Sequence, residues 1–201
     1  MVTKLYIPAL FVLLVTAFVS FRTGVPISEF TRDPAAITNA SPFLGMLSNI
    51  GILFWCASAT VCFFGAAVLR NRASSGELWA FLQSSGFITL VLMLDDLFLF
   101  HEEVIPRHFH IPQKAVLSAY AIAVLLYLVR FRVTILKTEF VALILALGFF
   151  GLSILVDVWL KAVLPWHHLF EDGFKLLGIV GWFGYFVRVC AQGIESVLLV
   201  D

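Results

Sequence analysis

Ionisable side chains gather beside particular ends of the apolar stretches in this sequence. All five histidines, His101, His108, His110, His167 and His168, lie at such ends or in the turns that follow them. Acidic residues join them there, namely Asp95, Asp96, Glu102, Glu103, Asp157, Glu171 and Asp172. Carboxylates and imidazoles can transfer protons, coordinate a divalent cation or bind a polar head group. The sequence therefore predicts one cluster with the groups needed for such chemistry.

The densest part of this cluster runs from Asp95 to Glu103. In a regular helix with 100° per residue, Asp95 aligns with Glu102 and Asp96 aligns with Glu103 to within about 20°. This spacing predicts two adjacent acidic lines, with His101 pointing elsewhere. The aspartate pair lies deeper in its apolar stretch than His101 does. An ionised aspartate at membrane depth costs about 2.5 to 3.5 kcal/mol, so at least one of the two needs a cation, a partner or a proton.

One interpretation is a network of ion pairs that holds helices together. Asp157 and Lys161 are spaced i, i+4, and so are Glu171 and Lys175. Asp172 and Lys175 offer a further pair at i, i+3. In this interpretation the protein is a non-catalytic membrane subunit.

A second interpretation is a site for a divalent transition metal such as zinc, iron or manganese. Helix bundles place carboxylate and imidazole ligands on facing helices. The candidate ligands are Asp95, Asp96, His101, Glu102, Asp157, His167, His168 and Glu171. A metal there would activate water in a membrane hydrolase. No familiar spacing such as H-x-x-x-H, H-E-x-x-H or E-x-x-H supports this site, and a polar head group is the other ligand that such a cluster predicts.

A third interpretation is a proton or cation relay in a transporter, because chains of acids and histidines mark such pathways. A continuous path would need polar groups through the rest of the membrane. The sequence offers few of them beyond Ser58, Thr60, Ser85 and Thr89. This scarcity argues against a conduit.

The composition indicates where these residues are placed. Of the 201 residues, 61% are hydrophobic and only 13% are charged, and the mean hydropathy is +1.01. Soluble domains carry about 25% charged residues, so lipid must replace water around most of this chain. The formal net charge is zero, which argues against a nucleic-acid partner. The bilayer is the predicted partner, together with a second copy or another membrane protein.

Six apolar stretches are long enough, or nearly so, to cross about 30 Å of hydrocarbon as helices. They cover Leu5 to Phe21, Phe43 to Leu69, Leu78 to Phe100, Ile111 to Val129, Phe140 to Leu164, and Gly173 to Val189 with an extension to Ile194 as the alternative end. The predicted fold is an all-α polytopic membrane helix bundle that forms a single transmembrane domain over residues 1–201. Small residues at packing spacing, including Gly148, Gly151, Gly178, Gly181 and Gly184, predict close helix contacts.

Basic residues in the short connections predict the orientation, because such residues stay in the cytoplasm. The set consists of Lys4, Arg70, Arg72, Arg130, Arg132, Lys137 and Arg188. This places the N- and C-termini in the cytoplasm and the Asp/Glu/His cluster on the opposite side. The predicted location is a cell membrane, of the bacterial inner-membrane type.

Overall fold

The computed structural model describes residues 2–70, 76–160 and 165–198. It divides the chain into two compact units, Met1–Met46 and Leu47–Asp201, and each is described by itself. The single domain expected over residues 1–201 stays a prediction.

The first unit consists of one long helix and two short ones. Helix α1 (Val2–Thr23) is followed by α2 (Ile27–Thr31) and α3 (Pro34–Thr38). Asp33 caps α3 by accepting a hydrogen bond from the backbone N–H of Ala35 at 2.8 Å. The large apolar side chains of α1 are exposed, as a helix that faces lipid requires.

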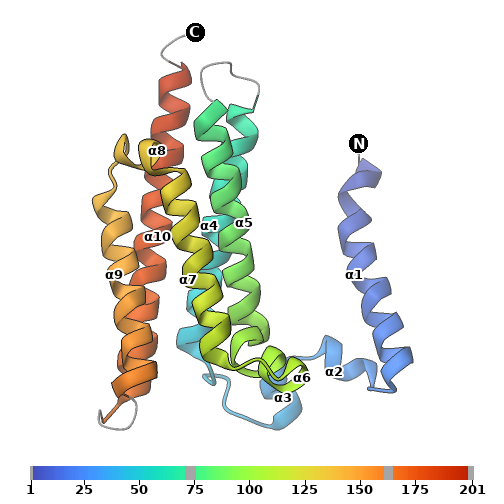
Figure 1. The fold of residues 1–201 in the computed structure, drawn as a ribbon. Helices are drawn as coiled ribbons and strands as arrows, with labels where there is room; N and C mark the ends of the chain where they lie inside the picture. Colours follow the sequence, from blue (N-terminus) through green and yellow to red (C-terminus); the bar gives the residue numbers. More distant parts are fainter. Residues whose placement is uncertain (1, 71–75, 161–164, 199–201) are drawn as a thin grey trace. The chain divides into compact units, whose positions relative to one another are not determined.

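The second unit is a bundle of long helices, which Figure 1 shows running side by side. They are α4 (Met46–Leu69), α5 (Gly76–Phe98), α7 (Gln113–Arg130), α9 (Val141–Leu155) and α10 (His167–Leu198). The shorter elements are α6 (Ile105–Phe109), α8 (Arg132–Leu136) and the π-helices η2 (Phe100–Val104) and η3 (Val156–Leu160).

The described part of the chain has no strands and contains six helices long and apolar enough to span a membrane. The spans are Tyr6–Thr23, Met46–Leu69, Gly76–Phe98, Gln113–Arg130, Val141–Leu160 and His167–Ser196. They confirm the all-α, six-helix prediction, although the last helix begins before Gly173 and extends past Val189. The protein is therefore a multipass membrane protein.

The two ends of the second unit differ in chemistry. Figure 1 shows the end of α4, helix α8 and the C-terminal part of α10 at one end, with α6 and the start of α7 at the other. Arg130 and Arg188 lie toward the first end and pair with Glu77 and Glu139 respectively. His101 lies toward the other end, in η2. The basic connections and the histidine-containing end are thus separated, and the side of the membrane that each end faces stays a prediction.

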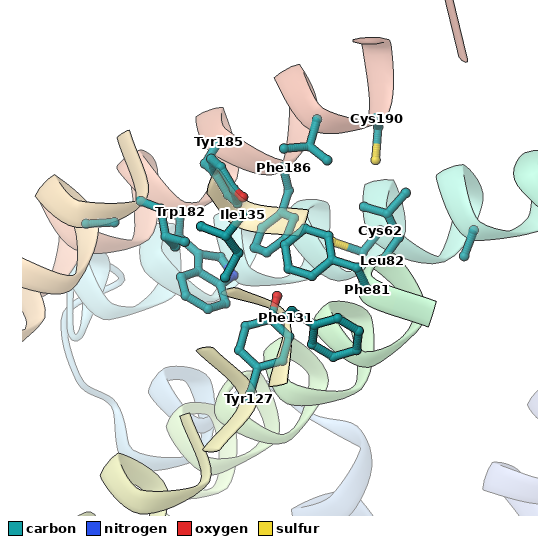
Figure 2. Packing of buried hydrophobic residues seen from close by; sticks show 14 of the residues in the cluster. Cys62, Phe81, Leu82, Tyr127, Phe131, Ile135, Trp182, Tyr185, Phe186 and Cys190 are labelled. Carbon is teal, nitrogen blue, oxygen red and sulfur yellow. The ribbon is translucent and has the colours of Figure 1, made fainter. Parts of the chain in front are cut away.

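Aromatic rings fill the core of the bundle. Figure 2 shows Phe81, Tyr127, Phe131, Tyr185 and Phe186 packed together. The rings of Phe81 and Tyr127 stack with centroids 5.7 Å apart. The hydroxyl groups of these tyrosines also have partners, because Tyr127 bonds to Ser85 and Tyr185 bonds to Thr138. The core therefore buries few polar atoms without compensation.

Helices α9 and α10 approach closely where two predicted small residues lie. A Cβ atom added to Gly178 would come within 2.6 Å of the Phe150 ring, and one added to Gly181 would come within 3.2 Å of the Ala146 Cβ. This confirms the packing role expected for both glycines. Gly148, Gly151 and Gly184 instead face open space, since an added Cβ would meet nothing within 4 Å.

Candidate functional site

The candidate site begins where helix α5 stops. Leu99 has a left-handed backbone conformation, with φ of 53°, and the chain continues as the π-helix η2. This break turns His101 back toward Asp95. The backbone N–H of His101 donates to Oδ1 of Asp95 at 2.9 Å, and its Nδ1 bonds to Oδ2 of the same carboxylate. The regular helix expected as far as Glu103, with two acidic lines and His101 pointing away, is therefore wrong.

Asp95 is a buried carboxylate with three hydrogen-bond donors. The residue as a whole is only 4% exposed. Besides the two groups of His101, the hydroxyl of Tyr120 on α7 donates to Oδ1 at 2.8 Å. Burial of an ionised carboxylate is costly unless such donors replace its water. These bonds join α5, η2 and α7 at one point.

Asp96 faces different partners. The indole Nε1 of Trp55 on α4 donates to Oδ2 at 3.0 Å, and the ammonium group of Lys175 on α10 pairs with Oδ1. The sequence pairs Lys175 with acids on its own helix, but the side chain reaches across to α5. This ion pair joins the third and sixth apolar stretches, as a network of ion pairs between helices requires. The predicted pair between Asp157 and Lys161 lies outside the described residues.

A cavity of about 440 Å³ opens beside these groups, between helices α7 and α9. This volume falls in the range of roughly 300 to 1,000 Å³ found for small-molecule sites. Most of its lining is apolar and includes Leu92, Leu117, Val124, Leu125, Leu128, Leu147, Phe150 and Ile154. Leu125 is 59% exposed and Ile154 is 43% exposed, so the cavity opens at the outer surface of the bundle. Hydrocarbon chains of a bilayer would lie against that surface.

The polar part of the lining contains most of the residues singled out in the sequence. Asp95, Asp96, His101, Glu102, Asp157 and Glu171 all line this cavity, together with Tyr120 and Lys175. Nε2 of Gln113 donates to Asp157 at 3.5 Å, and Glu171 lies 3.9 Å from Nδ1 of His168. Five carboxylates thus line one cavity, two from the end of α5 and one each from η2, η3 and α10.

His167 and His168 do not line the cavity. They occupy the first turn of α10, where their rings lie 3.9 Å apart, and the His168 side chain is 74% exposed. Glu171 is one turn further along the same helix, so the histidines lie beyond the end of the cavity. Sequence reasoning also missed Trp55 and Tyr120. Tyr120 and Tyr127 are the two tyrosines within the apolar run of α7, and a polar hydroxyl in such a run is the one signal that could have identified Tyr120.

The surroundings of His101 favour its protonated form. Burial of the ring is the largest influence on its pKa and lowers it, but the hydrogen bond to Asp95 and the negative charges of Asp95 and Glu102 outweigh that effect. Lys175 opposes them weakly. The net result is a pKa above the usual value of 6.5 for histidine. Nε2 lies 3.5 Å from Oε1 of Glu102, which is a loose ion-pair contact.

The arrangement does not favour the predicted metal centre. Within residues 2–70, 76–160 and 165–198, no group of three or more His, Cys, Asp or Glu side chains is positioned to hold a metal ion. The reason is visible at Asp95 and Asp96, whose oxygens accept bonds from His101, Tyr120, Trp55 and Lys175. Carboxylates occupied in this way present few free lone pairs to a cation.

These features define a multipass membrane protein with a lateral cavity that is apolar along most of its length and charged at one part. The chain belongs to the family described as a domain of unknown function (DUF8692), whose model matches residues 7–189. Comparison with curated proteins and with solved structures finds no match to this chain.

Proposed function

We propose that the second unit binds an amphiphilic molecule taken from the surrounding bilayer. Its hydrocarbon chain would lie in the cavity between α7 and α9, and its polar group would contact the charged residues around His101 and Glu102. The observation that supports this proposal is the divided lining of one cavity, with leucines such as Leu125 in one part and carboxylates in the other.

The physical basis of selectivity follows from the solvent. A lipid chain already lies in hydrocarbon, so moving it from the bilayer into an apolar cavity gains little hydrophobic free energy. Preference for one molecule must therefore come from the polar part, where hydrogen bonds and charges act at low dielectric. A polar group that can donate hydrogen bonds suits the carboxylates there, because ionised carboxylates only accept.

Two glycines on α9 provide a matched test of this proposal. Gly151 lines the cavity, Gly148 does not, and an added Cβ meets nothing within 4 Å at either position. Gly151→Leu should occupy the cavity without disturbing the helix contact, whereas Gly148→Leu should change only the outer surface. The measurement is quenching of a fluorescent long-chain fatty amine bound to the purified protein, with native mass spectrometry of co-purified lipid as a second readout.

The expected result is loss of saturable binding in Gly151→Leu and wild-type binding in Gly148→Leu. Equal binding by wild type and both variants would contradict the proposal. Both variants should keep the wild-type melting temperature, which separates blocked binding from misfolding.

An ion-pair network that only holds helices together is the alternative function for these residues. The contacts of Asp96 favour it, since Trp55 and Lys175 connect α4, α5 and α10 through this one carboxylate. In that case the variants of Asp96 would lower stability, and filling the cavity with Gly151→Leu would change nothing. The protein would then act as a membrane subunit whose partner lies elsewhere on its surface.

A divalent metal and a proton or cation relay are weaker proposals. The metal version requires near-stoichiometric zinc, iron or manganese in the purified protein and a fall in metal content in Glu171→Ala. The relay version requires proton or cation flux into proteoliposomes that depends on Asp96. Either result would replace amphiphile binding as the function of the cavity.

A further inference from the structure

We propose that His101 is an acid–base catalytic residue that hydrolyses an ester bond between the chain and the polar group of the bound amphiphile. This inference rests on the proposed function, because it needs an amphiphile in the cavity. It concerns chemistry without a metal ion, carried out by a histidine that Asp95 holds in place.

The two nitrogens of the His101 ring have different surroundings. Nδ1 bonds to Oδ2 of Asp95, and the backbone N–H of His101 donates to Oδ1 of the same carboxylate. The carboxylate thereby fixes the orientation of the ring and the proton on Nδ1. Nε2 is left to exchange a proton, since its nearest ionic neighbour is Glu102 at 3.5 Å. A carboxylate that orients an imidazole in this way is the arrangement that serves general-base catalysis.

The imidazole ring of His101 lies where the ester bond of a bound amphiphile would lie. His101 and Glu102 line the same cavity as the leucines of α7 and α9. An amphiphile whose chain lies along these leucines places the junction between its chain and its polar group beside the charged residues. Asp95 is then a positioning residue, because it acts on the substrate only through His101.

Water is the nucleophile that the surroundings allow. No hydroxyl or thiol of the described residues hydrogen-bonds to Nε2 of His101. A second cavity, with room for about one water molecule at about 10 Å³, is lined by Ser48 and Asp172. Asp96 and Lys175 line both cavities, so water has polar contacts leading toward the site.

The reaction can be written with its atoms balanced. Nε2 removes a proton from water while the water oxygen forms a bond to the ester carbonyl carbon. The bond from that carbon to the ester oxygen then breaks, and the proton on Nε2 passes to the departing alkoxide. The products are a carboxylic acid and an alcohol. Lys175 lines the same cavity, and its positive charge would stabilise the developing oxyanion.

The test uses two fluorogenic esters, 4-methylumbelliferyl palmitate and 4-methylumbelliferyl acetate, with the full-length protein in nanodiscs. The wild type should hydrolyse the palmitate ester, and His101→Gln should lower kcat by about 100-fold or more. His108→Gln is the matched control, because His108 is exposed and, among the residues that the structure describes, bonds only to the backbone oxygen of Val104. Gly151→Leu should lower palmitate hydrolysis by a much larger factor than acetate hydrolysis, because the added side chain occupies the space of the long chain.

The variant Asp95→Asn tests the role of His101 through the pH dependence of kcat/KM, which would not change if His101 had only a structural role. Asp95, Glu102 and Lys175 are the charged groups that face His101, and the hydroxyl of Tyr120 bonds to Asp95. Removing the negative charge of Asp95 should shift the acid limb of the kcat/KM profile to lower pH. An unchanged limb would overturn the role of His101 even if His101→Gln failed to fold.

The two proposals fail in different ways. Binding of the fluorescent fatty amine without hydrolysis of either ester would overturn catalysis and leave amphiphile binding intact. Hydrolysis at the wild-type rate in His101→Gln would do the same. Absence of amine binding in the wild type would overturn the proposed function itself.

Discussion

The imidazole of His101 turns back to bond with the carboxylate of Asp95, six residues earlier in the chain. An uninterrupted α-helix would place the two side chains about 120° apart around its axis, on different faces. The left-handed residue Leu99 makes the contact geometrically accessible. Strain of this kind persists where the surrounding bonds compensate for it, and here the three donors to Asp95 supply that compensation.

Replacing the buried carboxylate should be far more costly than replacing an exposed one. Asp95→Asn keeps the shape of the side chain but weakens three hydrogen bonds, so we expect a loss of about 2 to 3 kcal/mol in the free energy of unfolding. Glu103→Gln is the control. Its side chain is 42% exposed and pairs with Arg107 at 2.7 Å, so a loss of about 0 to 1 kcal/mol is expected. Denaturant unfolding in detergent measures both, and equal losses would contradict the central role of Asp95.

The raised pKa of His101 predicts a specific dependence of stability on pH. Because the pKa of His101 is higher in the folded than in the unfolded state, its protonation stabilises the fold. This contribution is fully present below the unfolded value of about 6.5 and is lost as the pH rises through the folded pKa. The difference in melting temperature between wild type and His101→Gln should therefore be largest near pH 6 and smaller at pH 9. A difference that grows with pH would contradict this assignment.

Asp96 and Lys175 should behave as one energetic unit. Each single variant, Asp96→Asn or Lys175→Met, breaks the ion pair and leaves one of its two charges in place, and the double variant removes both. The coupling energy of this double-mutant cycle should be about 1 to 3 kcal/mol. Glu139 and Arg188 form a control pair with side chains that are 56% and 65% exposed. Their coupling should be about 0 to 1 kcal/mol, and a similar value for both cycles would show that the partly buried pair is coupled no more strongly than an exposed one.

The long helices could be predicted because their physical cause is visible in the sequence. A run of about 20 apolar residues must be helical in lipid, where each backbone group needs a partner within its own segment. The break at Leu99 could not be predicted in this way. No glycine, asparagine or proline marks it, and leucine rarely adopts a left-handed conformation. The run from Asp95 to Glu103 has the pattern of one continuous helix. The side-chain orientation predicted for His101 from that helix was therefore wrong.

The sequence identified most residues of the candidate site, but it did not identify the contacts between them. Depth and charge along the chain identify Asp95, Asp96 and Asp157 as residues that need partners. Which partner each one takes depends on how the helices pack. Lys175 has acids at suitable spacing on its own helix, yet it pairs with Asp96 on α5. Contacts between distant segments of this kind leave no periodic pattern in a single sequence.

Accessibility of single cysteines should establish the orientation of the bundle. The prediction comes from Arg130, Arg132 and Lys137, because basic residues in short connections stay in the cytoplasm. Exposed Cys56 is first replaced by serine, while Cys62 and Cys190 are buried and can remain. Phe109 is 68% exposed in α6, and Lys137 is exposed toward the other end of the unit. In intact cells an impermeant maleimide should label Phe109→Cys, and it should label Lys137→Cys only after the membrane is permeabilised. The reverse pattern would place the cavity's charged residues on the cytoplasmic side, so that any polar group they bind would come from the inner leaflet.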